Sequence, residues 1–143
     1  MSHRRSPSRF PRIPVLGGAV LIAILSGCAP VVSPDPQLVA LQERALSLTR
    51  SAQLGEELRG DGRMFTTTTS ALLSGMEEKL ADVTREAALH QPADAEDAAY
   101  RDELLDASLA ALDAVQSADA GDAGAADALD AAAERLARLG DGS

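Results

Sequence analysis

Large side chains and cysteine are scarce in this sequence of 143 residues, which has no Trp, one Tyr, two Phe and one Cys. A single Cys excludes an intramolecular disulfide framework and a zinc site built from cysteines. A chain of this length forms at most one domain. Its apolar content comes mainly from 28 Ala and 20 Leu, so small side chains and leucine must supply most of any core.

Positive charge is also scarce beyond the first 28 residues. All 22 acidic residues follow Cys28, whereas four of the 13 basic residues precede it. The portion from Cys28 onward therefore has nine basic residues against 22 acidic ones, a net charge of −13. Such a body repels phosphate, which argues against nucleic acid as a partner.

The first 27 residues have the pattern of a secretory signal peptide. A basic segment broken by proline (residues 1–12) precedes the uncharged apolar run of residues 15–25. This run is shorter than the roughly 20 residues that a spanning helix needs. A twin-arginine signal is the weaker alternative, because Arg4-Arg5 is not followed by the apolar pair typical of such signals. We expect the rest of the chain to be exported.

The tetrapeptide Leu25-Ser26-Gly27-Cys28 resembles the lipobox of bacterial lipoproteins. The resemblance implies that Cys28 takes up a diacylglyceryl group and that a peptidase then cuts between Gly27 and Cys28. It also implies a location at the cell membrane, anchored by lipid on the extracytoplasmic face. Two acyl chains suffice for stable anchoring, at about 0.8 kcal/mol per buried CH₂. The alternative is a chance thiol behind an ordinary signal peptide or a short membrane anchor.

Three prolines in the stretch after Cys28 exclude a regular helix there. Pro30, Pro34 and Pro36 favour an extended, polyproline-like spacer over residues 28–36. The predicted organisation is thus a signal peptide at residues 1–27, a lipidated Pro-rich tether at 28–36 and a helical domain at 37–140.

Apolar residues in this last part recur at steps of three and four, the period of an α-helix. No segment alternates with a period of two, so we predict an all-α fold: a small antiparallel bundle of about four helices. The expected core-facing residues are Leu38, Leu41, Ala45, Leu48 and Ala52; Leu73, Met76, Leu80, Val83 and Ala87; Leu105, Leu109 and Leu112, widened by Leu104 and Val115; and Leu129, Ala132, Leu136 and Leu139.

Signals for helix ends accompany these stripes. Asp35 is a predicted N-cap with Pro36 in the first helical position, and Gly60-Asp61-Gly62 ends the first helix. The second helix is expected to stop at Pro92. Its early part is open. Residues 66–69 are β-branched and residues 74–77 match a capping box, so the helix is expected either to start late or to bend at Gly75. Gly140 is expected just after the last helix.

The sequence contains no recognisable combination of catalytic residues. His90 is the only His after Cys28, so neither a nucleophile–base pair nor a di-iron site with two Glu-x-x-His motifs can be assembled. We interpret His90 as a helix-terminal residue near Pro92. Residues 119–127 lack the acidic pattern of an EF-hand loop, so we do not expect a specific calcium site there. The alternative is a weak, nonspecific association of divalent cations with the acidic stretch 94–134. We expect no catalytic residue, cofactor or specific metal site.

Two aromatic side chains stand out in the helical part. We expect both Phe65 and Tyr100 to fill gaps between helices, with Phe65 as an anchor for a partner as the alternative. The leading hypothesis is a non-enzymatic lipoprotein that acts as an accessory or interaction module, with an unknown envelope protein as partner. The runner-up binds a ligand or cation through its acidic face or the bundle interior.

Overall fold

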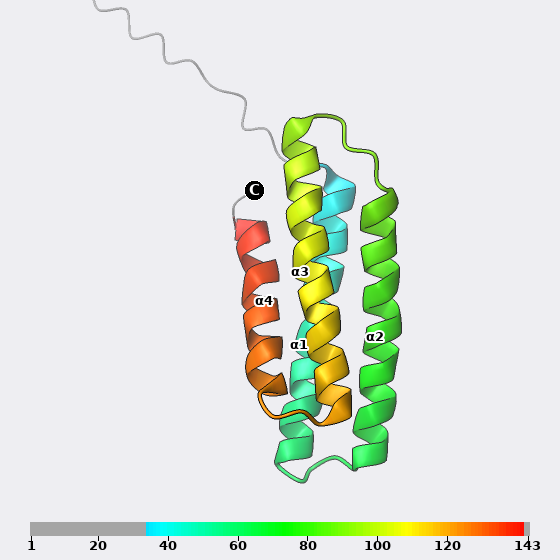
Figure 1. Ribbon diagram of the computed structural model, residues 1–143, viewed down its shortest axis with the longest axis vertical. Coiled ribbons are helices and arrows are strands. Elements are labelled where there is room, and N and C mark those ends of the chain that lie inside the picture. Colours follow the sequence, from blue (N-terminus) through cyan, green and yellow to red (C-terminus); the bar gives the residue numbers. More distant parts are fainter. Residues whose placement is uncertain (1–33, 142–143) are drawn as a thin grey trace, which may run out of the picture. The chain divides into compact units, whose positions relative to one another are not determined.

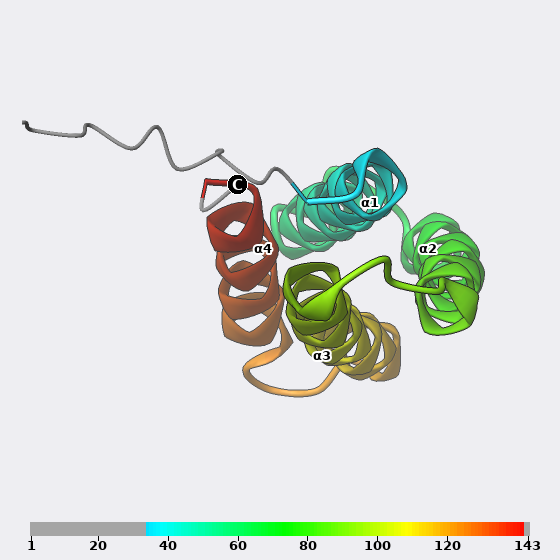
Figure 2. The same cartoon turned by 90° about the horizontal axis from the view of Figure 1, so that it is seen from above.

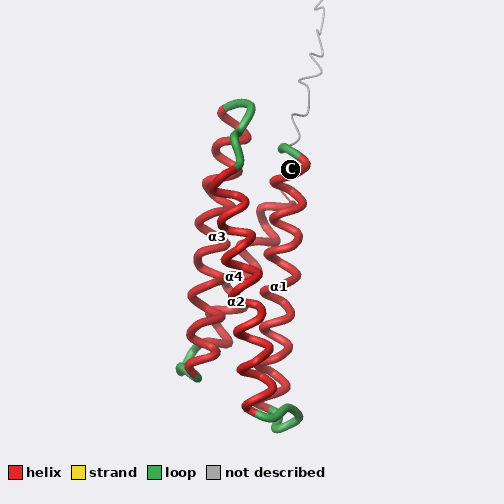
Figure 3. Tube along the Cα trace, turned by 90° about the vertical axis from the view of Figure 1, so that its right-hand side faces the viewer, coloured by secondary structure: helices red, strands yellow, loops and turns green. Residues whose placement is uncertain are grey.

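The computed structural model describes residues 34–141, and this part of the chain forms four α-helices without a strand (Figure 1). The helices are α1 (Pro36–Gly60), α2 (Thr66–Leu89), α3 (Ala95–Ala120) and α4 (Ala125–Asp141). Successive helices run antiparallel and are joined by short connections, as the view from the side also shows (Figure 3). The predicted all-α fold is confirmed. The predicted signal peptide and most of the predicted tether lie outside the described residues.

The first helix begins as its sequence predicts. The Asp35 side chain accepts a hydrogen bond from the backbone N–H of Gln37 at 2.7 Å, and Pro36 occupies the first helical position. Proline is tolerated there because the first amides of a helix have no partner within the helix. The helix ends at Gly60, at the predicted Gly-Asp-Gly turn.

The second helix begins early, at Thr66, and runs unbroken through Gly75. The capping box at residues 74–77 is therefore not a helix start. The backbone carbonyl of Phe65 accepts from the N–H groups of both Thr68 and Thr69 at 3.0 Å. Thr69 is buried in the core. Burial of this face outweighs the low helix propensity of the threonines.

The fourth helix also differs from the prediction at its end, because Gly140 lies inside it rather than just after it. The reason is a close approach to α1. A Cβ atom on Gly140 would lie 3.2 Å from the amide nitrogen of Gln42. That amide donates a hydrogen bond of 2.6 Å to the backbone carbonyl of Leu136. Glycine thus serves the packing of α4 against α1 and does not terminate the helix.

In cross-section, the diagonal of the bundle from α1 to α3 is shorter than the diagonal from α2 to α4. Each helix packs against its two neighbours around the bundle, and α1 also contacts α3 across the centre, whereas α2 does not reach α4. Figure 2 shows the four helices from above. The helices α1 and α3 therefore form the short diagonal.

Small side chains make this short diagonal possible. Most fully buried leucines come from the other diagonal, with Leu73 and Leu80 on α2 and Leu129 and Leu136 on α4. Both α1 and α3 bury mainly small or polar residues, namely Ala45, Thr49, Ala52 and Gly55 on α1 and Ala107, Ser108, Ala111, Ala114 and Ala118 on α3. Leucines on α2 and α4 thus fill the space beside two closely approaching backbones.

This arrangement corrects two of the predicted stripes. Leu109 is 52% exposed, and Leu105 and Leu112 are only half-buried. The core face of α3 is instead turned so that Leu104, Val115 and the alanines face inward. Leu41 and Leu48 of α1 are likewise half-buried, because polar Gln42 and Thr49 take part of the buried face. The stripe of α2 is confirmed in full, and that of α4 is confirmed except for half-buried Leu139.

We predict that Ala111→Leu destabilises the bundle by about 1–3 kcal/mol, because the added side chain must fit into a closely packed core. The matched control is Ala99→Leu, which places the same side chain on an exposed position of the same helix. We expect that control to change the free energy of unfolding by less than about 0.5 kcal/mol. Urea denaturation of both variants measures the difference. Equal stabilities would contradict the close packing of α1 and α3.

Candidate functional site

The residues to which the sequence assigns a specific chemistry are Cys28, the predicted lipidation site, and the Gly27–Cys28 bond, the predicted cleavage site. Both lie outside the described residues. Within residues 34–141, no helix is long and apolar enough to cross a membrane. The same residues hold no group of three or more His, Cys, Asp or Glu side chains that could bind a metal ion.

The amino end of the bundle, at residues 34–38, 87–98 and 138–141, gathers polar groups around Asp35. The backbone N–H of Asp35 donates a hydrogen bond of 2.9 Å to the buried carboxylate of Asp97 on α3. An Asp35 carboxylate oxygen lies 3.5 Å from Nε2 of His90, the residue that follows α2. Arg101 reaches the backbone carbonyl of His90 at 3.5 Å. This cluster ties the start of α1 to both α2 and α3.

His90 serves this structural cluster. Its side chain is only 10% exposed, and its position directly after α2 confirms the interpretation as a helix-terminal residue. Although Asp35 is close, Nε2 has no hydrogen-bond partner among the described residues. A catalytic base needs a nucleophile or substrate within hydrogen-bond reach, and here the neighbouring carboxylate is the N-cap of α1. His90 thus lies in the cluster that joins the end of α2 to the start of α1.

Asp97 was missed by the sequence analysis, although a signal was present. It lies three residues after Asp94, whose side chain caps α3 by accepting from the N–H groups of Glu96 and Asp97, both at 2.9 Å. A carboxylate in the first turn also interacts favourably with the positive end of the helix dipole. The sequence around Asp94 does not show that Asp97 is buried against the start of α1.

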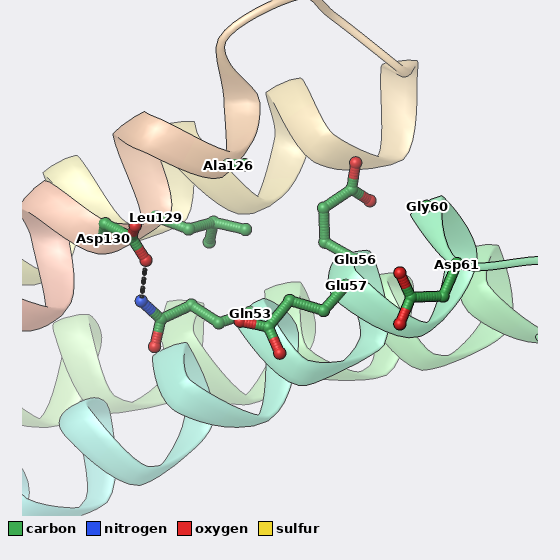
Figure 4. Close-up of a pocket in the computed structure, with 8 residues that line it drawn as sticks. All are labelled: Gln53, Glu56, Glu57, Gly60, Asp61, Ala126, Leu129 and Asp130. Atoms are coloured by element: carbon green, nitrogen blue, oxygen red, sulfur yellow. Dashed lines mark hydrogen bonds between the residues drawn. The ribbon is translucent and has the colours of Figure 1, made fainter. Parts of the chain in front are cut away.

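An open groove lies between the end of α1 and the start of α4 (Figure 4). It has a volume of about 460 Å³ and is lined by Gln53, Glu56, Glu57, Gly60, Asp61, Ala126, Leu129 and Asp130. Apolar and small residues alternate with four carboxylates on its walls. Gln53 donates a hydrogen bond of 2.6 Å to Asp130 across the groove, and Glu56 pairs with Arg59 at 2.6 Å. The lining suits a positively charged group with an apolar stem.

The acidic connection at residues 119–127 is a tight turn between α3 and α4. Gly121 adopts a left-handed conformation with φ 75° directly after α3, and Gly124 has φ 89°. Asp119 is bound by the Ser70 hydroxyl of α2 at 2.6 Å. Asp127 lies in the first turn of α4. These carboxylates belong to separate elements, Asp119 to α3 and Asp127 to α4.

The two aromatic side chains have opposite environments. Tyr100 is half-buried and packs against the core, as predicted, and its hydroxyl oxygen has no hydrogen-bond partner among the described residues. Burial, and secondarily the charge of Glu43, raises the pKa of Tyr100 above 10.0. Phe65 does not fill a gap between helices. It is 83% exposed, so the prediction for this residue is wrong.

We predict that Asp97→Ala lowers the free energy of unfolding by about 1–3 kcal/mol, because it leaves the N–H of Asp35 without its acceptor. Asp113→Ala, which removes an exposed carboxylate from the same helix, is the matched control and should stay within about 0.5 kcal/mol of the parent. Thermal and urea denaturation report both values. Equal destabilisation by the two substitutions would contradict the structural role of Asp97.

We also predict that Tyr100 titrates above pH 10 in the folded protein. Because the fold holds the phenol proton more tightly than the unfolded chain does, the free energy of unfolding should fall as the pH rises above 10. Absorbance of tyrosinate measures the titration directly, since this is the only Tyr in the chain. Glu43→Gln should reduce the rise only in part, because burial is its larger cause. A midpoint at or below 10 in the folded parent would contradict the burial of this ring.

Comparison with protein-family models, with curated proteins and with solved structures found no match to this chain. The resemblance to lipoproteins therefore rests on the tetrapeptide at residues 25–28 and the segment before it. For the bundle, the residues of the two ends and of the α1/α4 groove are the basis for a functional proposal.

Proposed function

We propose that this chain is a bacterial lipoprotein whose helical bundle is a non-enzymatic interaction module of the cell envelope. The observation that carries the proposal is Leu25-Ser26-Gly27-Cys28 behind a basic and then apolar segment. Acyl chains on Cys28 would hold the protein on the extracytoplasmic face of the cell membrane. A protein of the envelope would then be its partner.

The arrangement of the bundle fits such a role. The first helix begins at Pro36, only eight residues after Cys28. The Pro-rich stretch between them therefore leads from the proposed anchor directly to the amino end of the bundle. The opposite end, defined here as the far end and comprising residues 56–66 and 119–127, contains the α1–α2 and α3–α4 turns (Figure 1).

The chemistry of the described residues also supports an interaction module. The one His of this part of the chain lies against the N-cap of α1. The buried hydroxyl of Thr49 donates to the backbone carbonyl of Ala45 at 2.8 Å, and buried Asp97 accepts a backbone N–H. Asp97 thus joins α3 to the start of α1, and Thr49 bonds within α1. Both polar groups serve the fold, and we assign the action of the protein to its exposed surface.

A second candidate is a ligand-binding lipoprotein that takes up a small cation. The α1/α4 groove favours it, because four carboxylates line a cavity that also has apolar walls. Such a site suits an organic cation better than a bare metal ion, since Glu56 is already paired with Arg59. Saturable thermal stabilisation by spermidine, without any protein partner, would favour this candidate over the interaction module.

The proposed anchor is tested with Cys28→Ser in the full chain. We expect the parent to partition with membranes and the variant to be released, because serine offers no thiol for the thioether to the lipid. Membrane fractionation followed by detection of the chain measures the distribution. Ala29→Ser is the control, since it changes the neighbouring residue and leaves the thiol in place. A Cys28→Ser variant that stays with the membrane like the parent would rule out the lipid anchor.

A further inference from the structure

We propose that the far end of the bundle is a docking surface for a basic protein segment, with Phe65 as its apolar anchor. This inference rests on the proposed function and specifies the surface and the chemistry of the partner. Phe65 is the most exposed of the large apolar side chains in the described part of the chain, at 83%. Aromatic side chains are enriched at the centres of protein interfaces.

The position of Phe65 in its helix is the second observation. It is the N-cap residue of α2, and its side chain makes no capping hydrogen bond. Ser, Thr, Asp and Asn are strongly preferred at N-caps because their oxygens accept from the first free amides. An exposed phenylalanine at this position stabilises neither the core nor the helix end. Residues that are unfavourable for the stability of the local structure occur mainly at functional sites.

The α1–α2 turn holds Phe65 in a defined position. The backbone N–H of Asp61 bonds to the carbonyl of Glu57 at 2.9 Å, and that of Gly62 bonds to Arg59 at 3.0 Å. The next two N–H groups, of residues 63 and 64, both bond to the carbonyl of Leu58, at 2.9 and 3.1 Å. The turn is therefore closed onto the last turn of α1. An anchor presented by a preorganised turn loses little conformational entropy on binding.

The charge of the far end indicates the partner. Residues 56–66 and 119–127 contain six acidic residues and two arginines, and one of these arginines, Arg59, is paired with Glu56. A second copy of this chain would bring the same negative charge to the interface, which disfavours self-association. A segment rich in Lys or Arg with an apolar face is complementary to this surface. The α1/α4 groove at the same end offers a place for one basic side chain.

The test uses the full chain carrying Cys28→Ser, in solution without lipid, and a fluorescein-labelled amphipathic peptide of Leu and Lys. We expect Phe65→Ser to weaken binding of this peptide by about tenfold or more, as hot-spot residues do. The same substitution should raise the melting temperature by roughly 2–6 °C, because serine supplies the missing N-cap. Loss of affinity together with a gain in stability would separate a docking role from a structural one.

Leu89→Ser is the matched control, because Leu89 is also highly exposed, at 75%, and lies at the opposite end of α2. The amino end is acidic as well, with Asp35, Asp94, Glu96, Asp97 and Asp141 against Arg138, so electrostatic attraction alone does not distinguish the two positions. We expect Leu89→Ser to bind like the parent. The double substitution Glu57→Gln and Asp61→Asn should weaken binding severalfold, and an analogue with Glu in place of Lys should not bind.

Several outcomes would overturn the docking surface. One is equal binding by Phe65→Ser and the parent, and another is an equal loss in Phe65→Ser and Leu89→Ser. Dimerisation of the parent that depends on Phe65 would assign the surface to a second copy. Flotation of the Cys28→Ser chain with phosphatidylglycerol vesicles, again dependent on Phe65, would assign it to lipid. The peptide titration does not depend on how the chain is anchored, so its failure and that of the lipid anchor are distinguishable.

Discussion

The close approach of α1 and α3 across the centre of the bundle is the constraint on which the rest of the structure depends. Two backbones can pack this closely only if the residues between them are small, and both helices bury mainly Ala, Ser, Thr and Gly. The leucines that fill the core therefore come largely from α2 and α4. On α3, alanines take most of the buried face, while Leu105 and Leu112 are half-buried beside the core and Leu109 is exposed.

The sequence predicted best those features that depend on neighbouring residues alone. The Asp35 N-cap, the Gly60 stop and the full apolar stripe of α2 follow from local spacing and are confirmed. The predicted buried face of α3 was only partly right. Leu104 and Val115 are buried, whereas Leu105 and Leu112 are half-buried and Leu109 is exposed. A helix with alanine on one side and leucine on another can be turned either way. The close approach of α1 determines which side of α3 is buried. Gly140 was misplaced for a similar reason, since its contact with Gln42 joins residues 98 positions apart in the chain.

The two ends of the bundle differ in how they use their distinctive side chains. At the amino end, Asp35, His90, Asp97 and Arg101 contact one another and join three helices. At the far end, Phe65 contributes to neither the core nor a helix cap. Sequence alone left two roles open for Phe65, and its exposure decides against the role of gap filler. In the chain, the proposed anchor precedes the amino end, and the exposed aromatic lies at the opposite end of the bundle.

Mass spectrometry of the chain extracted from bacterial membranes tests the proposed lipid anchor. We expect an amino-terminal peptide that begins at Cys28 and whose mass includes a diacylglyceryl group on the sulfur. A peptide that retains the Gly27–Cys28 bond and a free thiol would contradict it.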